Sequence, residues 1–177
     1  VTSIGDAAFY SCSRLTDITI SESVTSSGNF AFSGCTSLTS VEIPENVTSI
    51  EKYAFFGCNS LASITIPKSV ASVGDKAFSG CDNLTVNLEN GSTLTSGNLG
   101  VNESQIATYW SEDNLTWTLS TDGTTMTISG TGAMKNYDAD SSPATQKKAN
   151  VKKVVIQEGV TSIGNSAFYN CSNLKSI

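Results

Sequence analysis

Apolar residues recur along this chain with a period of 23 residues. A valine, the dipeptide Ala-Phe, a cysteine and a leucine all return at this step, in copies that begin at Val1, Val24, Val47 and Val70. Written out, the unit is V-T-S-I-G-x-x-A-F-x-x-C-x-x-L-x-x-I-x-I-P-x-x. A unit this short cannot bury its apolar side chains alone, so the pattern predicts a solenoid in which neighbouring units stack.

A fifth copy of the unit lies near the end of the sequence, at Val160, Ala167, Cys171 and Leu174. The step from Cys81 to Cys171 is 90 residues, which is not a multiple of 23, so a different kind of segment separates the two groups. The chain starts without the strand that should precede its first unit, and we expect it to be a piece of a longer protein. We predict three segments: a first array of four repeats at 1–92, a linker plus β-hairpin cap at 93–150, and the start of a second array at 151–177.

Each unit contains one short stretch that predicts a strand. Residues 18–20, 41–43 and 64–66 alternate apolar and polar residues, and β-branched residues dominate them, which is typical of half-buried strands. In the fourth unit the same pattern, Val86 and Leu88, falls one residue early, so we expect that unit to be locally looser. The Ala-Phe…Cys…Leu stretch is too short for a free helix and predicts a helical turn. The expected fold is a right-handed solenoid of short parallel strands joined by short helical or 3-10 turns.

A β-hairpin is predicted within the intervening segment. The dipeptide Asp-Gly at 122–123 separates two alternating stretches, which is a strong signal for a tight turn. Pairing across this turn places Leu119 opposite Met126 and Trp117 opposite Ile128, with all four side chains on one face. This antiparallel hairpin interrupts the solenoid and is expected to act as a cap.

The apolar face of the hairpin needs a surface to cover, because a lone hairpin is marginally stable in water. The nearest candidate is the exposed end of the second array, which begins with the apolar stretch 154–156. The residues before the hairpin, 93–112, are rich in Gly, Asn, Ser and Thr and indicate a linker or an irregular cap.

The sequence contains no histidine, which excludes Ser-His-Asp and Cys-His nucleophile pairs and every His-ligated metal site. Its five cysteines occupy one position of the repeat, and a spacing of 23 residues does not suit zinc. Their odd number argues against a disulfide framework, so we interpret them as a buried ladder of small apolar side chains. We therefore predict no catalytic residue, no metal and no cofactor.

Asn136, Asp138 and Asp140 alternate like the ligands of a calcium loop. The sixth position of such a loop is Ser141 rather than Gly, and the twelfth is Lys147 rather than Glu. A solvated loop is the other interpretation, and the sequence leaves calcium binding open.

The formal net charge of −6 argues against nucleic acid or an anionic membrane as the main partner. No apolar run approaches the roughly 20 residues that span a bilayer, so no membrane insertion is expected. One basic run, Lys147, Lys148, Lys152 and Lys153, indicates a solvated strand flank, with a docking patch for an acidic partner as the alternative.

The repeat with its L-x-x-I-x-I core and preceding cysteine resembles a leucine-rich repeat. Its 23-residue form, V-T-S-I-G-x-x-A-F-x-x-C, is similar to the BspA-like leucine-rich repeat family over residues 1–92 and 151–177. The resemblance implies a secreted or surface-attached bacterial protein, a class in which some members bind host proteins or join cells. It implies no catalysis by the repeats.

One candidate surface follows from this resemblance, because the strand face of such repeats is the usual binding surface. Its outward positions are polar and carry no aromatic ring, and they extend to Ser21, Pro44 and Pro67. The candidate ligand-binding residues on it are Asp17, Thr19, Ser40, Glu42, Ser63 and Thr65. A second candidate surface comes from the residue after Ala-Phe, which is aromatic in three repeats, Tyr10, Phe56 and Tyr169. These rings form a surface if they are exposed, and partial burial between turns is the other interpretation.

The sequence therefore predicts a non-catalytic binding or adhesion module of a secreted or cell-surface bacterial protein. The expected partner is a protein of the host extracellular matrix or of a cell surface, and a glycan is an alternative partner. Two other functions stay open, a structural spacer that presents other domains and a carbohydrate-binding module.

Overall fold

The computed structural model describes residues 1–147 and 150–177. They form two compact units, Val1–Ile106 and Ala107–Ile177, and each is described by itself. The predicted limits of the three sequence segments stay a prediction.

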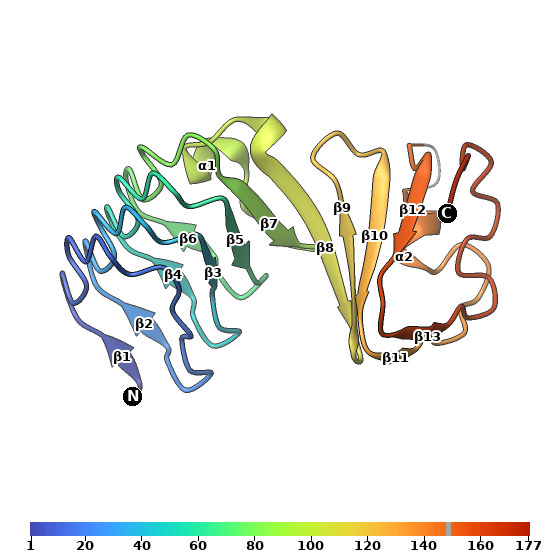
Figure 1. The fold of residues 1–177 in the computed structure, drawn as a ribbon, viewed down its shortest axis with the longest axis horizontal. Coiled ribbons are helices and arrows are strands. Elements are labelled where there is room, and N and C mark those ends of the chain that lie inside the picture. The colour runs from blue at the N-terminus through green and yellow to red at the C-terminus, as the bar shows by residue number, and fades with distance from the viewer. Residues whose placement is uncertain (148–149) are drawn as a thin grey trace. The chain divides into compact units, whose positions relative to one another are not determined.

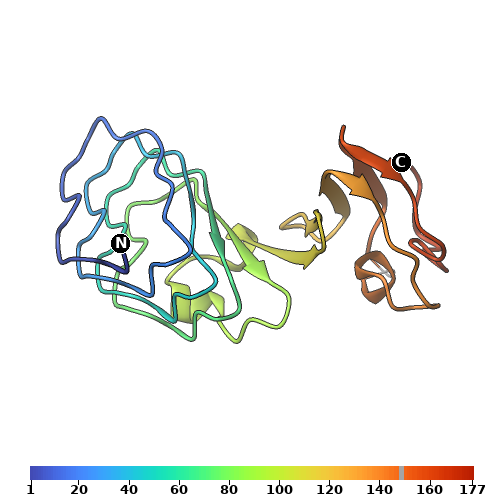
Figure 2. The same cartoon turned by 90° about the horizontal axis from the view of Figure 1, so that it is seen from below.

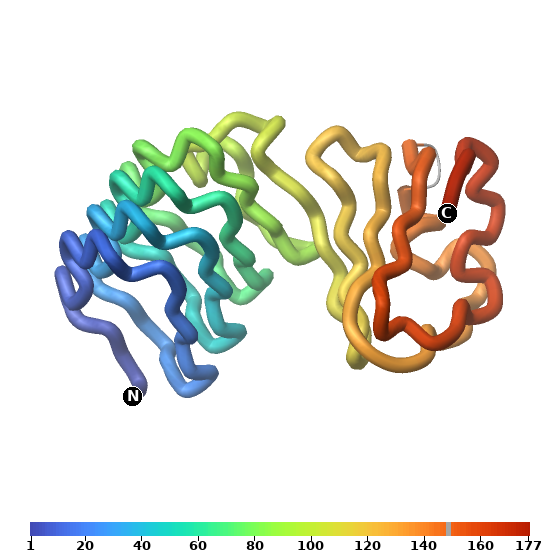
Figure 3. Tube along the Cα trace, viewed as in Figure 1, coloured from blue at the N-terminus to red at the C-terminus, as the bar shows by residue number. Residues whose placement is uncertain are grey.

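The first unit is a solenoid of stacked turns with short parallel strands, as the repeat predicted (Figures 1 and 3). These strands form two sets, of which the sequence predicted one. In one set, β5 (Ser63–Ile66) lies between β3 (Ser40–Glu42) and β7 (Thr85–Glu89). The other set comes from the V-T-S-I stretch of each repeat, which the sequence did not single out as a strand. It consists of β1 (Ser3–Ile4), β2 (Ser26–Ser27), β4 (Ser49–Ile50) and β6 (Ser72–Val73).

Two predictions about the strands were wrong. Residues 18–20 form no strand, because they lie in the first turn and have a neighbouring turn on one flank only. The fourth unit is not loosened by its early pattern. Instead β7 is five residues long and pairs with β5 over four positions, from Ser63↔Thr85 to Ile66↔Leu88. The step between paired residues drops from 23 for Ser40↔Ser63 to 22 for Ser63↔Thr85, so a shift of register absorbs the missing residue.

The Ala-Phe…Cys…Leu stretch forms a chain of tight turns instead of the predicted helical turn. Bonds such as Cys35 N–H to Phe32 O (3.1 Å) and Leu38 N–H to Cys35 O (3.1 Å) span three residues. Two positions in every repeat have positive φ, which breaks a right-handed helix. They are Ala7, Phe30, Tyr53, Lys76 and Ser166 at the first position, and Ser11, Gly34, Gly57, Gly80 and Asn170 at the second.

Successive turns of the first unit are joined by a regular row of backbone hydrogen bonds, called here the turn ladder. Alternate N–H groups of one turn donate to alternate carbonyls of the next turn. Phe32 N–H donates to Ala54 O (2.8 Å) and Gly34 N–H to Phe56 O (2.8 Å), and three such bonds form at each junction. Figure 2 shows the turns of this unit lying over one another.

The core of the first unit is built from columns of identical side chains. The rings of Phe9, Phe32, Phe55 and Phe78 stack with successive centroid distances of 5.1, 5.2 and 5.7 Å. Beside them the thiol of Cys58 donates to Phe32 O at 3.1 Å, and its equivalents repeat this bond. Four of the five cysteines are buried, as predicted. Cys12, in the first turn, is exposed.

Residues 93–112, interpreted as a linker or an irregular cap, contain regular structure. The helix α1 (Ser96–Leu99) is capped by Thr95, whose hydroxyl accepts from Asn98 N–H at 3.3 Å. The 3-10 helix η1 (Glu103–Gln105) and the strand β8 (Ile106–Glu112) follow. Leu99 is buried in the core of the first unit, which fixes α1 against the fourth repeat.

In the second unit, β9 (Leu115–Leu119) and β10 (Thr125–Gly130) form the predicted hairpin, and β8 pairs antiparallel with β9. The register is as predicted, with Met126 opposite Leu119 and Ile128 opposite Trp117. All four side chains are buried.

The hairpin face covers the start of the second array, as expected. The strand β10 pairs parallel with β12 (Lys153–Ile156), and Trp117 lies 5.8 Å from Phe168 between ring centroids. A second parallel pair joins β11 (Gly132–Ala133) to β13 (Val160–Ser162), and the helix α2 (Pro143–Gln146) completes the unit.

The segment between β11 and α2 takes the place of a preceding turn for the second array. Tyr137 N–H donates to Asn165 O (2.9 Å), and the Ser142 hydroxyl donates to Ala167 O (2.5 Å). The side-chain oxygen of Asn136, a candidate calcium ligand, accepts from Asn165 N–H at 2.8 Å. Of the basic run noted in the sequence, Lys148 lies outside the described residues.

We expect the phenylalanine column to dominate the stability of the first unit. Phe55→Ala should lower the free energy of unfolding by about 3–5 kcal/mol, because it opens a cavity between two stacked rings. The neighbouring variant Phe56→Ser removes a ring that is 42% exposed and should cost less than about 1.5 kcal/mol. Urea unfolding followed by circular dichroism measures both. Equal losses would contradict this account of the core.

Candidate functional site

The first candidate surface is the polar strip, defined by the six residues Asp17, Thr19, Ser40, Glu42, Ser63 and Thr65. Parallel pairing of β3 with β5 sets Ser40 beside Ser63 and Glu42 beside Thr65. Between these pairs, Val41 and Ile64 point into the core. Asp17 and Thr19 are exposed but lie on the first turn, where no strand forms.

The prediction that Pro44 and Pro67 face outward is wrong. Pro44 and Pro67 are both buried, because the chain turns inward directly after each strand. The strip also continues beyond the predicted residues, since Asn87 on β7 pairs with Thr65. The six residues of the strip and Asn87 together carry four hydroxyls, two carboxylates and one amide, and none of the seven is aromatic.

The second surface carries stacked aromatic rings and is called here the aromatic patch, defined by Phe30, Tyr53 and Phe56. The rings of Phe30 and Tyr53 are parallel, with centroids 4.7 Å apart. Phe56 meets Tyr53 edge-on at 5.7 Å, and Lys76 Nζ lies 5.9 Å from the centre of the Tyr53 ring. Phe30 and Phe56 are exposed.

The fold does not require these rings. Phe30 and Tyr53 occupy the first positive-φ position of their repeats, which Ala7, Lys76 and Ser166 occupy elsewhere. A positive φ is unfavourable for a bulky residue, so local conformation selects against aromatics there. Phe56 likewise stands where Ser79 stands in the next repeat.

Of the aromatic residues predicted from the sequence, Tyr10, Phe56 and Tyr169 are all exposed. Phe56 belongs to the aromatic patch, and Tyr169 lies in the second unit. Sequence reasoning missed Phe30 and Tyr53. Their signal was present as an aromatic residue directly before Ala-Phe in two adjacent repeats, but only the stacked turns bring those residues together.

One ion pair borders the polar strip. Glu89, at the end of β7, is 8% exposed and accepts from Lys68 Nζ at 2.6 Å and from Lys68 N–H at 2.9 Å. Burial alone would raise the pKa of Glu89, but the bonds from Lys68 outweigh burial and lower it. The pair ties the edge of one repeat to the next.

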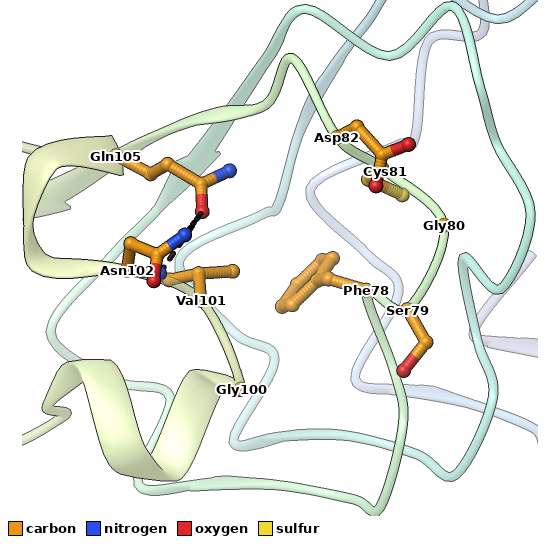
Figure 4. Close-up of a pocket in the computed structure, with 9 residues that line it drawn as sticks. All are labelled: Phe78, Ser79, Gly80, Cys81, Asp82, Gly100, Val101, Asn102 and Gln105. Atoms are coloured by element: carbon orange, nitrogen blue, oxygen red, sulfur yellow. Dashed lines mark hydrogen bonds between the residues drawn. The ribbon is translucent and has the colours of Figure 1, made fainter.

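The first unit also contains a pocket of about 480 Å³ at the end of the fourth repeat, between residues 78–82 and residues 100–105 (Figure 4). The titratable groups of its lining are Cys81 and Asp82. Burial raises the pKa of Cys81 to about 11, and its thiol donates to Phe55 O at 3.2 Å. A thiol with a raised pKa stays protonated at neutral pH and is a poor nucleophile.

Burial also raises the pKa of the Cys35 thiol, and it raises that of Cys58 to about 12. In the described part of the chain no group of three His, Cys, Asp or Glu residues is placed to hold a metal ion. Among the helices of these residues, none is long and apolar enough to cross a membrane.

The chain is a leucine-rich repeat solenoid, because its turns stack, one set of its strands forms a face, and identical side chains form columns in its core. The BspA type leucine rich repeat region matches it in six copies, over residues 1–102 and 142–177. The chain belongs to this family, as the sequence resemblance indicated. Leucine-rich repeats of this type are generally protein-interaction modules and typically not enzymes.

Several solved structures are similar to almost the whole chain. A leucine-rich repeat protein from Bacteroides ovatus is 23% identical, with 99% of this chain and 58% of that one covered and a TM-score of 0.46. A T. pallidum leucine-rich repeat protein is also 23% identical, and the match covers 99% of this chain and 72% of that one with a TM-score of 0.48. A leucine-rich cell surface protein from Faecalibacterium prausnitzii is 24% identical, and the match covers 99% of this chain and 57% of that one with a TM-score of 0.28. The chain thus spans less than two thirds of the Bacteroides protein, and no curated protein matches it.

Thiol reactivity should follow burial. In the native protein at pH 8, Ellman's reagent should react quickly with Cys12, the exposed one of the five cysteines, and slowly with the buried four. Cys12→Ser should abolish the fast phase, while full reaction should return in urea. A fast phase that survives Cys12→Ser would show that the buried ladder opens readily.

The Lys68–Glu89 pair predicts a dependence of stability on pH. Because the pKa of folded Glu89 lies below its ordinary value of 4.5, the pair stabilises the fold at neutral pH, and this contribution disappears as the pH falls through the lowered pKa. Glu89→Gln should therefore cost roughly 1 kcal/mol at pH 7, a figure kept small by the exposed lysine, and less at pH 3.

Urea unfolding of wild type and Glu89→Gln at the two pH values measures this difference. Glu42→Gln, on the same face but exposed, controls for the loss of one negative charge. A Glu89→Gln effect of equal size at both pH values would refute a role for the ion pair.

Proposed function

We propose that this chain is a non-catalytic protein-binding module of a secreted or cell-surface bacterial protein, and that the aromatic patch is its main contact surface. The observation that carries the proposal is the exposed stack of Phe30 on Tyr53 with Phe56 at its edge. Exposed Tyr and Phe side chains are enriched at protein interfaces, where they contribute large apolar areas at low entropic cost.

Two features support recognition of a protein. The patch sits on rigid turns held by the turn ladder, so little order is lost on binding. Lys76 and Lys52 flank it, and Lys52 Nζ lies 3.8 Å from Asp75, so both signs of charge surround the rings. This arrangement resembles the apolar centre and polar rim of protein interfaces.

The polar strip has a secondary role in this proposal. It lacks the Trp, Tyr and Arg side chains that dominate binding energy, so Asp17, Thr19, Glu42 and Thr65 would add weak contacts that gain strength only when many repeats act together. The extracellular location is supported by membership of the BspA type family, and one similar structure carries the description of a cell surface protein.

The spacer function is the second candidate, and the regular turn ladder favours it. A stiff stalk needs a repeating hydrogen-bonded backbone and no ligand. Binding separates the two candidates, because a spacer makes no saturable contact of its own.

The test is surface plasmon resonance of the purified chain over a panel of extracellular-matrix proteins, with a glycan array in parallel. We expect saturable binding to a protein at physiological salt. The triple variant Phe30→Ala/Tyr53→Ser/Phe56→Ser, built from residues that other repeats use at these positions, should weaken it at least about tenfold.

Two matched variants complete the test. Tyr169→Ser removes an exposed ring at the position equivalent to Phe56 and should leave affinity unchanged. A quadruple alanine variant of Asp17, Thr19, Glu42 and Thr65 should reduce affinity less than the aromatic triple variant does. Absence of saturable binding would favour the spacer, and hits confined to the glycan array would favour the carbohydrate-binding module.

A further inference from the structure

Among the residues that the structure describes, the turn ladder ends in the fourth repeat with hydrogen-bond donors that have no acceptor. At each earlier junction three alternate N–H groups donate to the next turn, as Tyr53, Phe55 and Gly57 do to Asp75, Ala77 and Ser79 at 3.1, 2.9 and 2.8 Å. The equivalent groups of the fourth turn belong to Lys76, Phe78 and Gly80. No acceptor in the described ranges 1–147 and 150–177 receives a hydrogen bond from them.

A carbonyl beside these donors also lacks one partner. In the first three repeats, the carbonyl oxygens of Phe9, Phe32 and Phe55 each accept the thiol of the next repeat's cysteine. The carbonyl of Phe78 has no such cysteine, since the residue 23 positions beyond Cys81 is Ser104. The end of the ladder therefore presents three donors and one acceptor in a known arrangement.

The pocket described above lies at this end of the ladder. Phe78 and Gly80 form one wall, and Val101 and Asn102 form the opposite wall (Figure 4). Its volume of about 480 Å³ falls within the range of about 300–1,000 Å³ that is usual for ligand sites.

The polar side chains of the opposite wall do not satisfy the donors. Asn102 Nδ2 donates to Gln105 Oε1 at 3.2 Å, and Gln105 Nε2 donates to Leu84 O at 3.0 Å. The segment that follows the fourth repeat thus covers its apolar core with Leu99 and Val101 but leaves the backbone edge open.

We propose that this pocket binds a short polypeptide segment, which presents backbone carbonyls at alternate residues and adds one more turn to the ladder. Lys76 contributes its backbone N–H here and its side chain to the rim of the aromatic patch, but the rings of the patch take no part in this site. The proposal does not depend on the proposed function. Because recognition is through the backbone, the site tolerates many sequences, and its specificity comes from the turn conformation that the segment must adopt.

A polypeptide fits the donors better than an anion. In the existing junctions each donor has its own acceptor, and the acceptors are two residues apart, as Ala77 O and Ser79 O are. Donors spaced for separate carbonyls do not converge on a single phosphate or carboxylate. The carboxylate of Asp82 also lines the pocket, and the chain carries a net charge of −6, both unfavourable for an anion.

The probe is an acetylated and amidated peptide with the sequence of residues 50–60, I-E-K-Y-A-F-F-G-C-N-S. Within the fold this stretch supplies the carbonyls of Lys52, Ala54 and Phe56 to the second turn and the Cys58 thiol to Phe32 O. Titrated into the full ¹⁵N-labelled chain, it should shift the amide signals of Lys76, Phe78 and Gly80 saturably. A scrambled peptide should leave those signals in place.

Two tryptophan variants give a matched comparison. Asp82→Trp places a ring in the pocket and should weaken binding at least ~tenfold. Thr36→Trp changes the equivalent residue two repeats earlier and should bind like wild type. Circular dichroism confirms that both variants are folded before they are compared.

Several results would overturn the proposal. They are an absence of shifts at the three amides, equal shifts with the scrambled peptide, and unchanged affinity in Asp82→Trp. Saturable shifts of the same amides by inorganic phosphate without any response to the peptide would show an anion site instead. None of these outcomes bears on the aromatic triple variant, so the two proposals fail independently.

Discussion

Everything in the first unit depends on backbone hydrogen bonding from one turn to the next. Each junction of the turn ladder has three bonds, and each bond requires the same residue of every repeat to lie directly above its equivalent. That requirement stacks Phe32 on Phe55 and brings the Cys58 thiol to Phe32 O. A period of 23 residues is therefore a condition of the fold as well as a feature of the sequence. Where one residue is missing, the strand register shifts and the ladder continues.

The same constraint separates structure from function. Positions inside the turns are restricted to Ala, Phe, Cys and Leu, whereas positions that face outward vary without cost to the ladder. The first positive-φ position holds Ala, Phe, Tyr, Lys and Ser in different repeats. In such a molecule the outward residues are the ones available for function. The buried thiols with a raised pKa are therefore structural, and the exposed rings are the candidates for binding a partner.

A stack of turns must also end, and the two ends described here are treated differently. The first turn of the second array is covered by the hairpin, and residues of the preceding segment satisfy its carbonyls, as the Ser142 hydroxyl does for Ala167 O. At the end of the fourth repeat, α1 and Val101 cover the apolar side chains but leave backbone donors open. A stack of turns must both bury its apolar side chains and give its backbone polar groups hydrogen-bond partners. At the end of the fourth repeat the apolar side chains are buried, but three backbone donors have no partner among the described residues.

Local patterns determined a large part of this protein. The period, the buried cysteines and the pairing of Trp117 with Ile128 all follow from residues that are close in the sequence or repeat in phase. Tertiary structure decided the rest. The left-handed backbone at Phe30 and Tyr53 arises from stacking against neighbouring turns, and so does the contact between those rings. The strand nature of β8 and the open donors of Lys76, Phe78 and Gly80 depend on which neighbour is present on each flank. A single repeat carries no information about its neighbours, so these features appear only when the turns are assembled.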